Sequence, residues 1–163
     1  MPEKLKVVKP PRGLARLALR APILLYRLGL GRLLGHRFLR LTHVGRKSGR
    51  LRQVVLEVVR FDHATHTYYI AVGFGEHSSW YQNILANPHV QVDSAGEHME
   101  GRAEPLSPEQ AGQELLDYAR RYPLAFRELV HFMGYRLDGS DQDILALGHD
   151  VHIFALRPAN QEA

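Results

Sequence analysis

Residues 41–60 constrain the fold most strongly, because two apolar runs there flank a short cationic turn. The runs at 38–44 and 53–61 are rich in β-branched and aromatic side chains, which predicts a strand on each side of the turn. Both faces of the second run are apolar, so this strand is expected in the middle of a sheet. Glu57 interrupts the run and is expected to need a polar partner.

The turn between these strands combines conformational freedom with positive charge. Gly45 and Gly49 permit positive φ and the close approach of a ligand. Like charges repel across so short a turn, and the turn itself contains no acid to neutralise them. Two interpretations follow, a solvated hairpin turn and a binding site for a polyanion. The cations are Arg46, Lys47, Arg50 and Arg52.

Positive charge is concentrated in the first third of the chain. Residues 1–60 contain 15 Lys and Arg against 2 acids, whereas the remaining residues contain 6 against 15. An anion-binding surface is therefore expected within residues 1–60. The chain of 163 residues, 45% of them apolar, is long enough for one folded domain. The absence of cysteine excludes disulfides, thiolate chemistry and cysteine-based zinc sites.

Residues 1–36 are predicted to form a basic, amphipathic helical segment. Between positions 14 and 28, apolar residues recur at spacings of three and four, while Arg16, Arg20 and Arg27 share the other side. Such a helix packs on the core or lies on an anionic membrane surface. The longest uncharged piece, residues 21–26, is too short for a membrane span or signal peptide. We expect a cytoplasmic protein, with peripheral attachment to the inner face of the cell membrane as an alternative.

The rest of the chain predicts four further strands, two longer helices and a short third one. Because the strands are mostly consecutive and joined by short turns, they favour an antiparallel α+β barrel of about six strands with flanking helices. Ser107 and Gln110 form a capping-box pattern, and Ser140 with Asp143 predicts a second helix cap. The expected strands are 67–72, 89–93, 98–103 and 151–156, and the helices are 108–121, 124–133 and one that follows residue 140.

A further short helix is expected between the third and fourth strands. Ser79 and Gln82 match a capping box, and Pro88 marks the end of the helix. Its N-terminus offers free N–H groups and partial positive charge beside the glycine-containing loop 73–78. This terminus is a second candidate contact for an anion or a carbonyl group.

Several other chemistries lack the required patterns. The ten histidines include no His-Glu-x-x-His motif, so no metal site is predicted. Neither Ser78 nor Ser79 lies in a Gly-x-Ser-x-Gly elbow, which disfavours a serine nucleophile. Nucleic acid is not an expected partner, because no recognised binding motif is present and part of the cations lie on an apolar helix.

Two motifs resemble the deazaflavin-dependent nitroreductase family, which belongs to the flavin-binding split β-barrels. The first reads LTHVGRKSGR at residues 41–50, followed by Arg52, and the second reads WYxNxxANPxVxV at residues 80–92. The resemblance implies a split β-barrel over residues 37–158 that binds the deazaflavin coenzyme F420, with residues 159–163 as a tail. Because related barrels are commonly dimers, it also implies a homodimer.

The resemblance further implies which residues bind the coenzyme. The F420 tail carries a phosphate and several glutamates, which suits a turn with four cations. FMN, with one phosphate, needs fewer cations and is the alternative cofactor. The turn would hold the tail, and residues 71–73 with the start of the short helix would lie along the ring. The expected cofactor-binding residues are Gly45, Arg46, Lys47, Ser48, Gly49, Arg52, Val54, Ala71, Val72, Gly73, Trp80, Tyr81 and Asn83.

The implied function is hydride transfer from reduced F420 to an electron-poor, apolar small molecule such as an enone, quinone or nitroarene. Nitro reduction fits less well than F420 binding, because Phe74 and Gly75 stand where members that activate nitro compounds tend to have a lysine. Tyr135, His77 and Ser78 are the candidate proton donors by loop position. The alternatives are an FMN-dependent reductase and a non-catalytic barrel that binds a flavin, haem or lipid-like ligand.

Overall fold

A computed structural model describes residues 1–5, 28, 35–73 and 75–161. The predicted amphipathic helix at 14–28 therefore lies outside the described residues, apart from Leu28. The strands are β1 (Glu3–Lys4), β2 (Phe38–Val44), β3 (Leu51–Asp62), β4 (Thr67–Ala71), β5 (His89–Ser94), β6 (Glu97–Pro105), β7 (Tyr135–Arg136) and β8 (Ile153–Pro158). The α-helices are α2 (Ser79–Ala86), α3 (Pro108–Arg121), α4 (Pro123–Phe132) and α5 (Asp141–Ala146), and the 3₁₀ helices are η2 (Gly75–His77), η3 (Leu147–His149) and η4 (Ala159–Gln161).

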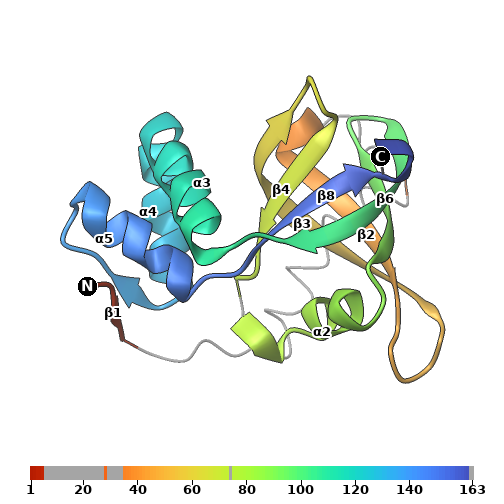
Figure 1. The fold of residues 1–163 in the computed structure, drawn as a ribbon, viewed down its shortest axis with the longest axis horizontal. Coiled ribbons are helices and arrows are strands. Elements are labelled where there is room, and N and C mark those ends of the chain that lie inside the picture. The colour runs from red at the N-terminus through yellow and green to blue at the C-terminus, as the bar shows by residue number, and fades with distance from the viewer. Residues whose placement is uncertain (6–27, 29–34, 74, 162–163) are drawn as a thin grey trace.

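Six antiparallel strands close into a barrel in the order β2-β3-β4-β8-β6-β5 (Figure 1). The 12-residue strand β3 pairs with β2 through its first part and with β4 through its second, with a register shift between Val58 and Arg60. A bulge of this kind bends a long strand around a barrel. The expectation of an antiparallel α+β barrel of about six strands is confirmed. The pair β1–β7 forms a separate two-stranded sheet that the sequence did not predict.

Alternation of side chains along the strands divides the apolar residues between two cores. Val58, Tyr68 and Ile70 lie in the barrel core, whereas their neighbours Val59 and Tyr69 lie in a second core. This follows from the two-residue period of a strand, which sends successive side chains to opposite faces. The near-continuous apolar run of β3 therefore serves both cores, as a strand covered on both faces must.

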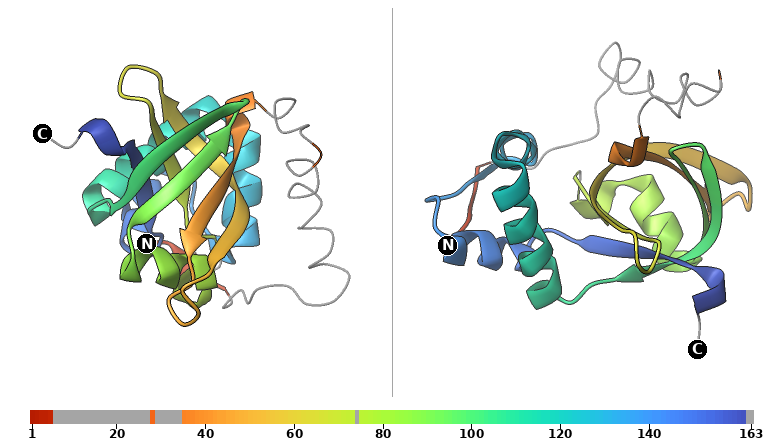
Figure 2. Two further views of the ribbon diagram at one scale, coloured as in Figure 1. Left: turned by 90° about the vertical axis from the view of Figure 1, so that its right-hand side faces the viewer. Right: turned by 90° about the horizontal axis from the view of Figure 1, so that it is seen from above.

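The second core lies between one wall of the barrel and the layer formed by α3, α4 and α5 (Figure 2). The predicted capping box of α3 is present, with Ser107 and Gln110 bonded to each other's backbone, and Ser140 caps α5. The expected partner of Glu57 comes from this layer, since the hydroxyl of Tyr118 donates to Glu57 Oε1 at 2.9 Å. The helical layer thus satisfies the one acid that interrupts β3.

Helix α2 lies across one end of the barrel, the end at which the β2–β3 turn also projects (Figure 1). Trp80, Tyr81 and Ile84 extend from α2 into the barrel core. The chain therefore uses one short helix both to cover the barrel end and to support the cationic turn.

The capping box predicted for this helix is wrong. The N-cap is Ser78, one residue earlier than expected, and its side chain makes no capping hydrogen bond. Gln82 Nε2 instead donates to the carbonyl oxygen of Glu76 at 2.7 Å. The reason is η2, an unpredicted turn of 3₁₀ helix that brings this carbonyl within reach of the Gln82 amide.

Candidate functional site

The β2–β3 turn is compact because its backbone closes on itself. The Gly45 N–H donates to the Arg50 carbonyl at 2.8 Å, and the Gly49 N–H donates to the Gly45 carbonyl at 2.8 Å. Gly49 has φ +68°, a conformation that glycine adopts readily. A Cβ on Gly45 would lie 2.7 Å from Ser48 Oγ and 3.3 Å from the Arg50 carbonyl oxygen, so glycine lets the turn close without a shift of the Ser48 side chain. Both glycines of the motif thus have a structural reason.

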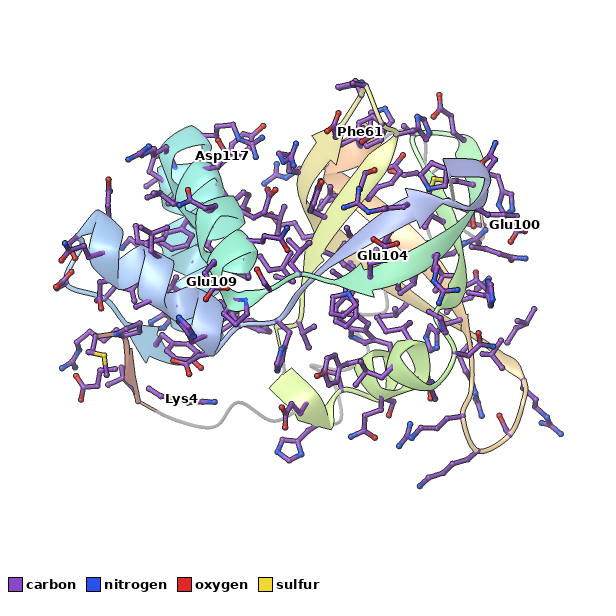
Figure 3. All side chains as sticks on the ribbon, in the orientation of Figure 1. Lys4, Phe61, Glu100, Glu104, Glu109 and Asp117 are labelled. Atoms are coloured by element: carbon purple, nitrogen blue, oxygen red, sulfur yellow. The ribbon has the colours of Figure 1, made fainter. Side chains whose placement is uncertain are left out.

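The cations of the turn remain available to a ligand. Arg46, Lys47, Arg50 and Arg52 are exposed, and in the described part of the chain none of them forms an ion pair with an acid. Figure 3 shows side chains tipped with nitrogen extending from the turn into solvent. The turn is therefore a concentrated, uncompensated positive charge of the kind that binds polyanions.

Helix α2 holds this turn through the side chain of Asn83. Asn83 Oδ1 accepts the backbone N–H of Arg46 at 3.1 Å and the Arg46 Nη1 donor at 3.0 Å. Asn83 Nδ2 lies 3.2 Å from His43 Nδ1 on β2. Asn83 and His43 are both buried. The structure thus engages the Asn83 amide with the turn, although the sequence had assigned this residue to the cofactor ring.

His43 was not a predicted site residue, although it lies within the first motif, LTHVGRKSGR. Burial lowers the pKa of His43 to about 4, and the neighbouring cation Arg52 acts in the same direction. The imidazole is therefore neutral at physiological pH. A neutral ring can accept the hydrogen bond from Asn83, which a protonated ring cannot.

The N-terminus of α2 presents a buried hydroxyl group without a partner. Ser78 is 4% exposed, and its Oγ has no hydrogen-bond partner within the described residues. A buried polar group in this state costs free energy unless something else satisfies it. Its neighbour His77 is exposed on η2. Of the predicted proton donors, Ser78 has the surroundings of a ligand-binding group.

The segment expected to lie along the ring runs beside α2. The Val72 N–H donates to the His152 carbonyl at 2.9 Å, and the His152 ring stacks on Tyr81 at 5.3 Å between centroids. His152 Nε2 also lies 3.4 Å from Glu76 Oε1. At Gly73, an added Cβ would lie 3.8 Å from the ring of Phe132 on α4. His152 was missed because it is one of ten histidines and lies far from both motifs in the sequence.

Two predicted residues lie in other surroundings. Tyr135 is buried in the second core, where the Lys4 ammonium group lies 5.4 Å from its ring centroid. Val54 is partly buried against the barrel core from β3. The structure therefore joins the turn to Asn83 of α2, joins Val72 to His152, whose ring stacks on Tyr81, and buries Tyr135 in the second core.

These features define a β-barrel with a cationic turn, a short helix packed on one barrel end and a buried, unsatisfied hydroxyl group at the N-cap of that helix. A comparison with protein families matches residues 26–131, more than half of the chain, to the family described as F420H(2)-dependent quinone reductase. The chain belongs to this family and is an F420H2-dependent oxidoreductase. The family match supports F420H2 as cofactor and gives no support to FMN. A comparison with curated proteins found no match.

Solved structures share the fold at low sequence identity. An F420-H2 dependent reductase, FDR-A, is 23% identical with a TM-score of 0.52, over 74% of this chain and 94% of that one. A protein described as a domain-swapped dimer is 22% identical with a TM-score of 0.53, over 84% and 100%. The heme storage protein HutZ from Vibrio cholerae is 15% identical with a TM-score of 0.50, over 82% and 88%. At these identities the likeness supports the barrel fold alone.

Within the described residues, neither a membrane-crossing helix nor a group of metal-binding side chains is present. None of the described helices has both the length and the apolar character that crossing a membrane requires. The same part of the chain contains no group of three or more His, Asp or Glu side chains that could hold a metal ion.

Proposed function

We propose that this protein transfers a hydride from reduced F420 to a small, apolar, electron-poor acceptor, and that a quinone is the foremost candidate. The observation that carries the proposal is the cationic turn, which has no acidic partner among the described residues and is held at Asn83 to α2, the helix whose N-cap Ser78 has an unsatisfied hydroxyl group. The family assignment supports the coenzyme and favours a quinone among the acceptors that the sequence suggested.

The residues of the turn fit the anionic tail of the coenzyme. Lys47, Arg50 and Arg52 are exposed and have no acidic partner among the described residues. Arg46 uses one guanidinium donor for Asn83 and keeps others, because guanidinium has five N–H groups. We therefore propose all four cations as tail contacts, including Arg50, which the predicted set of site residues omitted. Several anionic groups match several cations better than one phosphate does.

The Ser78 end of the site fits the ring of the coenzyme and the acceptor. Ser78 Oγ is buried and lacks a partner in the described structure, so a ligand oxygen that accepts its hydrogen bond removes an energetic cost. Tyr81, which lies on the helix that Ser78 precedes, stacks on the ring of His152.

When bound, reduced F420 supplies the hydride, and the protein supplies position and electrostatics. The cations of the turn would hold the anionic tail, and this contact would keep the ring near α2. The Ser78 hydroxyl donates a hydrogen bond to an oxygen on which negative charge develops, which stabilises the transition state. His77, exposed on η2, is the proposed route by which a proton reaches the product from solvent. Tyr135 is the less favoured donor because it is buried in the second core.

The first test measures coenzyme binding. Purified protein is titrated with F420 and separately with FMN, at low and high salt, with coenzyme fluorescence as the signal. We expect salt-sensitive F420 binding that Lys47→Ala and Arg52→Ala each weaken by about tenfold. Arg120→Ala is the matched control, because Arg120 is an exposed cation paired with Asp141 at 2.6 Å. Tighter binding of FMN than of F420 would contradict the proposal.

The second test separates chemistry from binding. Single-turnover oxidation of F420H2 by a naphthoquinone is compared between the parent protein, Ser78→Ala and Ser79→Ala. Ser79 is the matched control because it is the adjacent serine and is exposed. We expect Ser78→Ala to slow hydride transfer by about 10- to 100-fold and Ser79→Ala to leave it unchanged. Equal rates in the two variants would remove Ser78 from the mechanism.

Two proposed partners follow from the same function. We propose that the basic segment 1–36 attaches the enzyme to anionic membranes, where lipid-soluble quinones reside. Flotation with vesicles that contain anionic lipid tests this attachment, and vesicles of neutral lipid are the control. A protein that stays with the soluble fraction in both flotations would contradict the proposed membrane attachment.

We also propose a homodimer, which sedimentation at several protein concentrations tests.

A further inference from the structure

The contacts of Asn83 and His43 indicate a role that the sequence did not assign to either residue. We infer that Asn83, held in place by His43, is a positioning residue that orders the cationic turn against α2 before an anionic ligand arrives. The ordering of the turn is argued from contacts within the protein. Its consequence for F420 affinity rests on the proposed function.

The hydrogen bonds of Asn83 fix the direction of its amide group. Asn83 Oδ1 accepts two donors of Arg46, one from the backbone and one from the guanidinium. His43 Nδ1, at 3.2 Å from Asn83 Nδ2, is the acceptor on the other side. A flipped amide would place Nδ2 against the donors of Arg46 and lose these bonds. The two Arg46 donors therefore select this orientation, and His43, with Nδ1 as the acceptor, satisfies the amide hydrogen on the other side.

This contact is the tie between the turn and the helix. Within the described residues, no other hydrogen bond joins residues 45–50 to α2. Asn83 and His43 are each 4% exposed, so neither can exchange its partner for water without local opening. The turn is thus held at Arg46 by two buried side chains that come from different elements, β2 and α2.

The chemistry of an amide suits this task better than that of an acid. Four cations within one short turn repel one another and would spread in solution. An aspartate at position 83 could also accept from Arg46, but its charge would neutralise part of the field that the ligand requires. The Asn83 amide orders the turn and leaves its positive charge intact. A turn that is already ordered loses less conformational entropy when it binds.

The exchange of the Arg46 amide hydrogen with solvent tests the ordering directly, in protein without coenzyme. We expect Asn83→Leu to accelerate this exchange by about tenfold or more, as measured by two-dimensional NMR. Asn87→Ala is the matched control, because Asn87 caps the other end of α2 and its Oδ1 accepts from the His89 N–H at 3.2 Å. Unchanged protection of the Arg46 amide in Asn83→Leu would overturn the inference.

A second pair of variants keeps the test decisive if Asn83→Leu does not fold. His43→Leu removes the acceptor for Asn83 Nδ2, whereas His43→Gln retains a side-chain oxygen that can accept this hydrogen bond. We expect faster Arg46 exchange in His43→Leu than in His43→Gln. The same exchange rate in these two variants would show that His43 does not hold the amide.

The salt dependence of F420 affinity distinguishes a positioning residue from a direct contact. We expect Asn83→Leu to weaken F420 by about tenfold and to leave the slope of log Kd against log salt unchanged, since the number of cations is unchanged. Lys47→Ala is the contrast, because removal of a charge that binds the tail reduces the slope. A reduced slope in Asn83→Leu would overturn the positioning role. If the parent protein does not bind F420, the proposed function fails, and the amide exchange still decides whether Asn83 orders the turn.

Discussion

The cations of the barrel wall and those of the β2–β3 turn differ in their surroundings. On the wall, Arg40 pairs with Asp93 at 3.0 Å, Arg60 with Glu114 at 2.7 Å, and Arg157 with Glu104 at 2.7 Å. On the turn, the described structure contains no acid paired with any of the four cations. Within the described residues, these wall cations are therefore paired with acids, whereas the four cations clustered at one place, the turn, are not. That place is where we propose that the ligand binds.

The pKa values of two histidines also differ between the wall and the turn. Hydrogen bonds that the His98 ring donates to the carboxylates of Asp93 and Glu100 raise the pKa of this histidine on the wall. Burial and the cation Arg52 lower the pKa of His43 beneath the turn. The wall therefore stabilises positive charge on His98, whereas burial first and the cation Arg52 second oppose positive charge on His43. Each of the following predictions tests this contrast.

The largest expected effect comes from reversing charge on the turn. The double variant Lys47→Glu with Arg52→Glu is expected to weaken F420 more than about 100-fold at low salt, because two attractive charges become repulsive. Its free energy of unfolding should stay within about 0.5 kcal/mol of the parent, since no described ion pair is lost. Fluorescence titration and urea unfolding measure the two quantities. A strongly destabilised protein would show that these cations support the fold after all.

For a cation of the barrel wall we expect the opposite pattern, a loss of stability with little change in F420 affinity. Arg60 makes two hydrogen bonds to Glu114, and its guanidinium carbon lies 4.2 Å from the ring centroid of Tyr69. We expect Arg60→Ala to lower the free energy of unfolding by about 2 kcal/mol and to change F420 affinity by less than about twofold. Urea unfolding measures the free energy of unfolding. Arg120→Ala, which removes an exposed pair, is the control and should cost less than about 0.5 kcal/mol.

The smallest expected effect is the dependence of stability on pH that His43 contributes. The pKa of His43 is lower in the folded protein than its ordinary value of 6.5, so the unfolded chain binds a proton first as the pH falls. His43 therefore contributes stability above the unfolded pKa, and this stability is lost as the pH falls toward about 4. We expect the parent protein to lose on the order of 1 kcal/mol more than His43→Leu between about pH 6 and about pH 5.

His98 is expected to behave in the opposite sense. Its raised folded pKa means that its contribution to stability is present below the unfolded pKa and is lost as the pH rises through the folded pKa. NMR titration of the ring protons should therefore give a midpoint above 6.5 for His98 and a midpoint well below 6.5 for His43. Similar midpoints for the two rings would remove the electrostatic contrast between wall and turn.

Much of the fold could be predicted because its signals are local. The caps at Ser107 and Ser140 are short patterns in which the side chain bonds backbone groups a few residues away. The turn after β2 was equally readable, since Gly45 and Gly49 permit a tight reversal. The cap of α2 was misplaced by one residue because adjacent serines fit the pattern, and the 3₁₀ turn that decides between them has no strong local signal.

The sequence by itself determined the barrel class, the cationic turn and the cofactor family, because periodicity, charge and a motif are properties of neighbouring residues. The tertiary structure alone decided which polar groups are satisfied. It joined Asn83 to His43 and Arg46 across 40 and 37 residues of sequence, and it left Ser78 Oγ buried without a partner in the described chain. Hydrogen bonds between distant elements depend on how the elements pack, and packing leaves no local trace in the sequence.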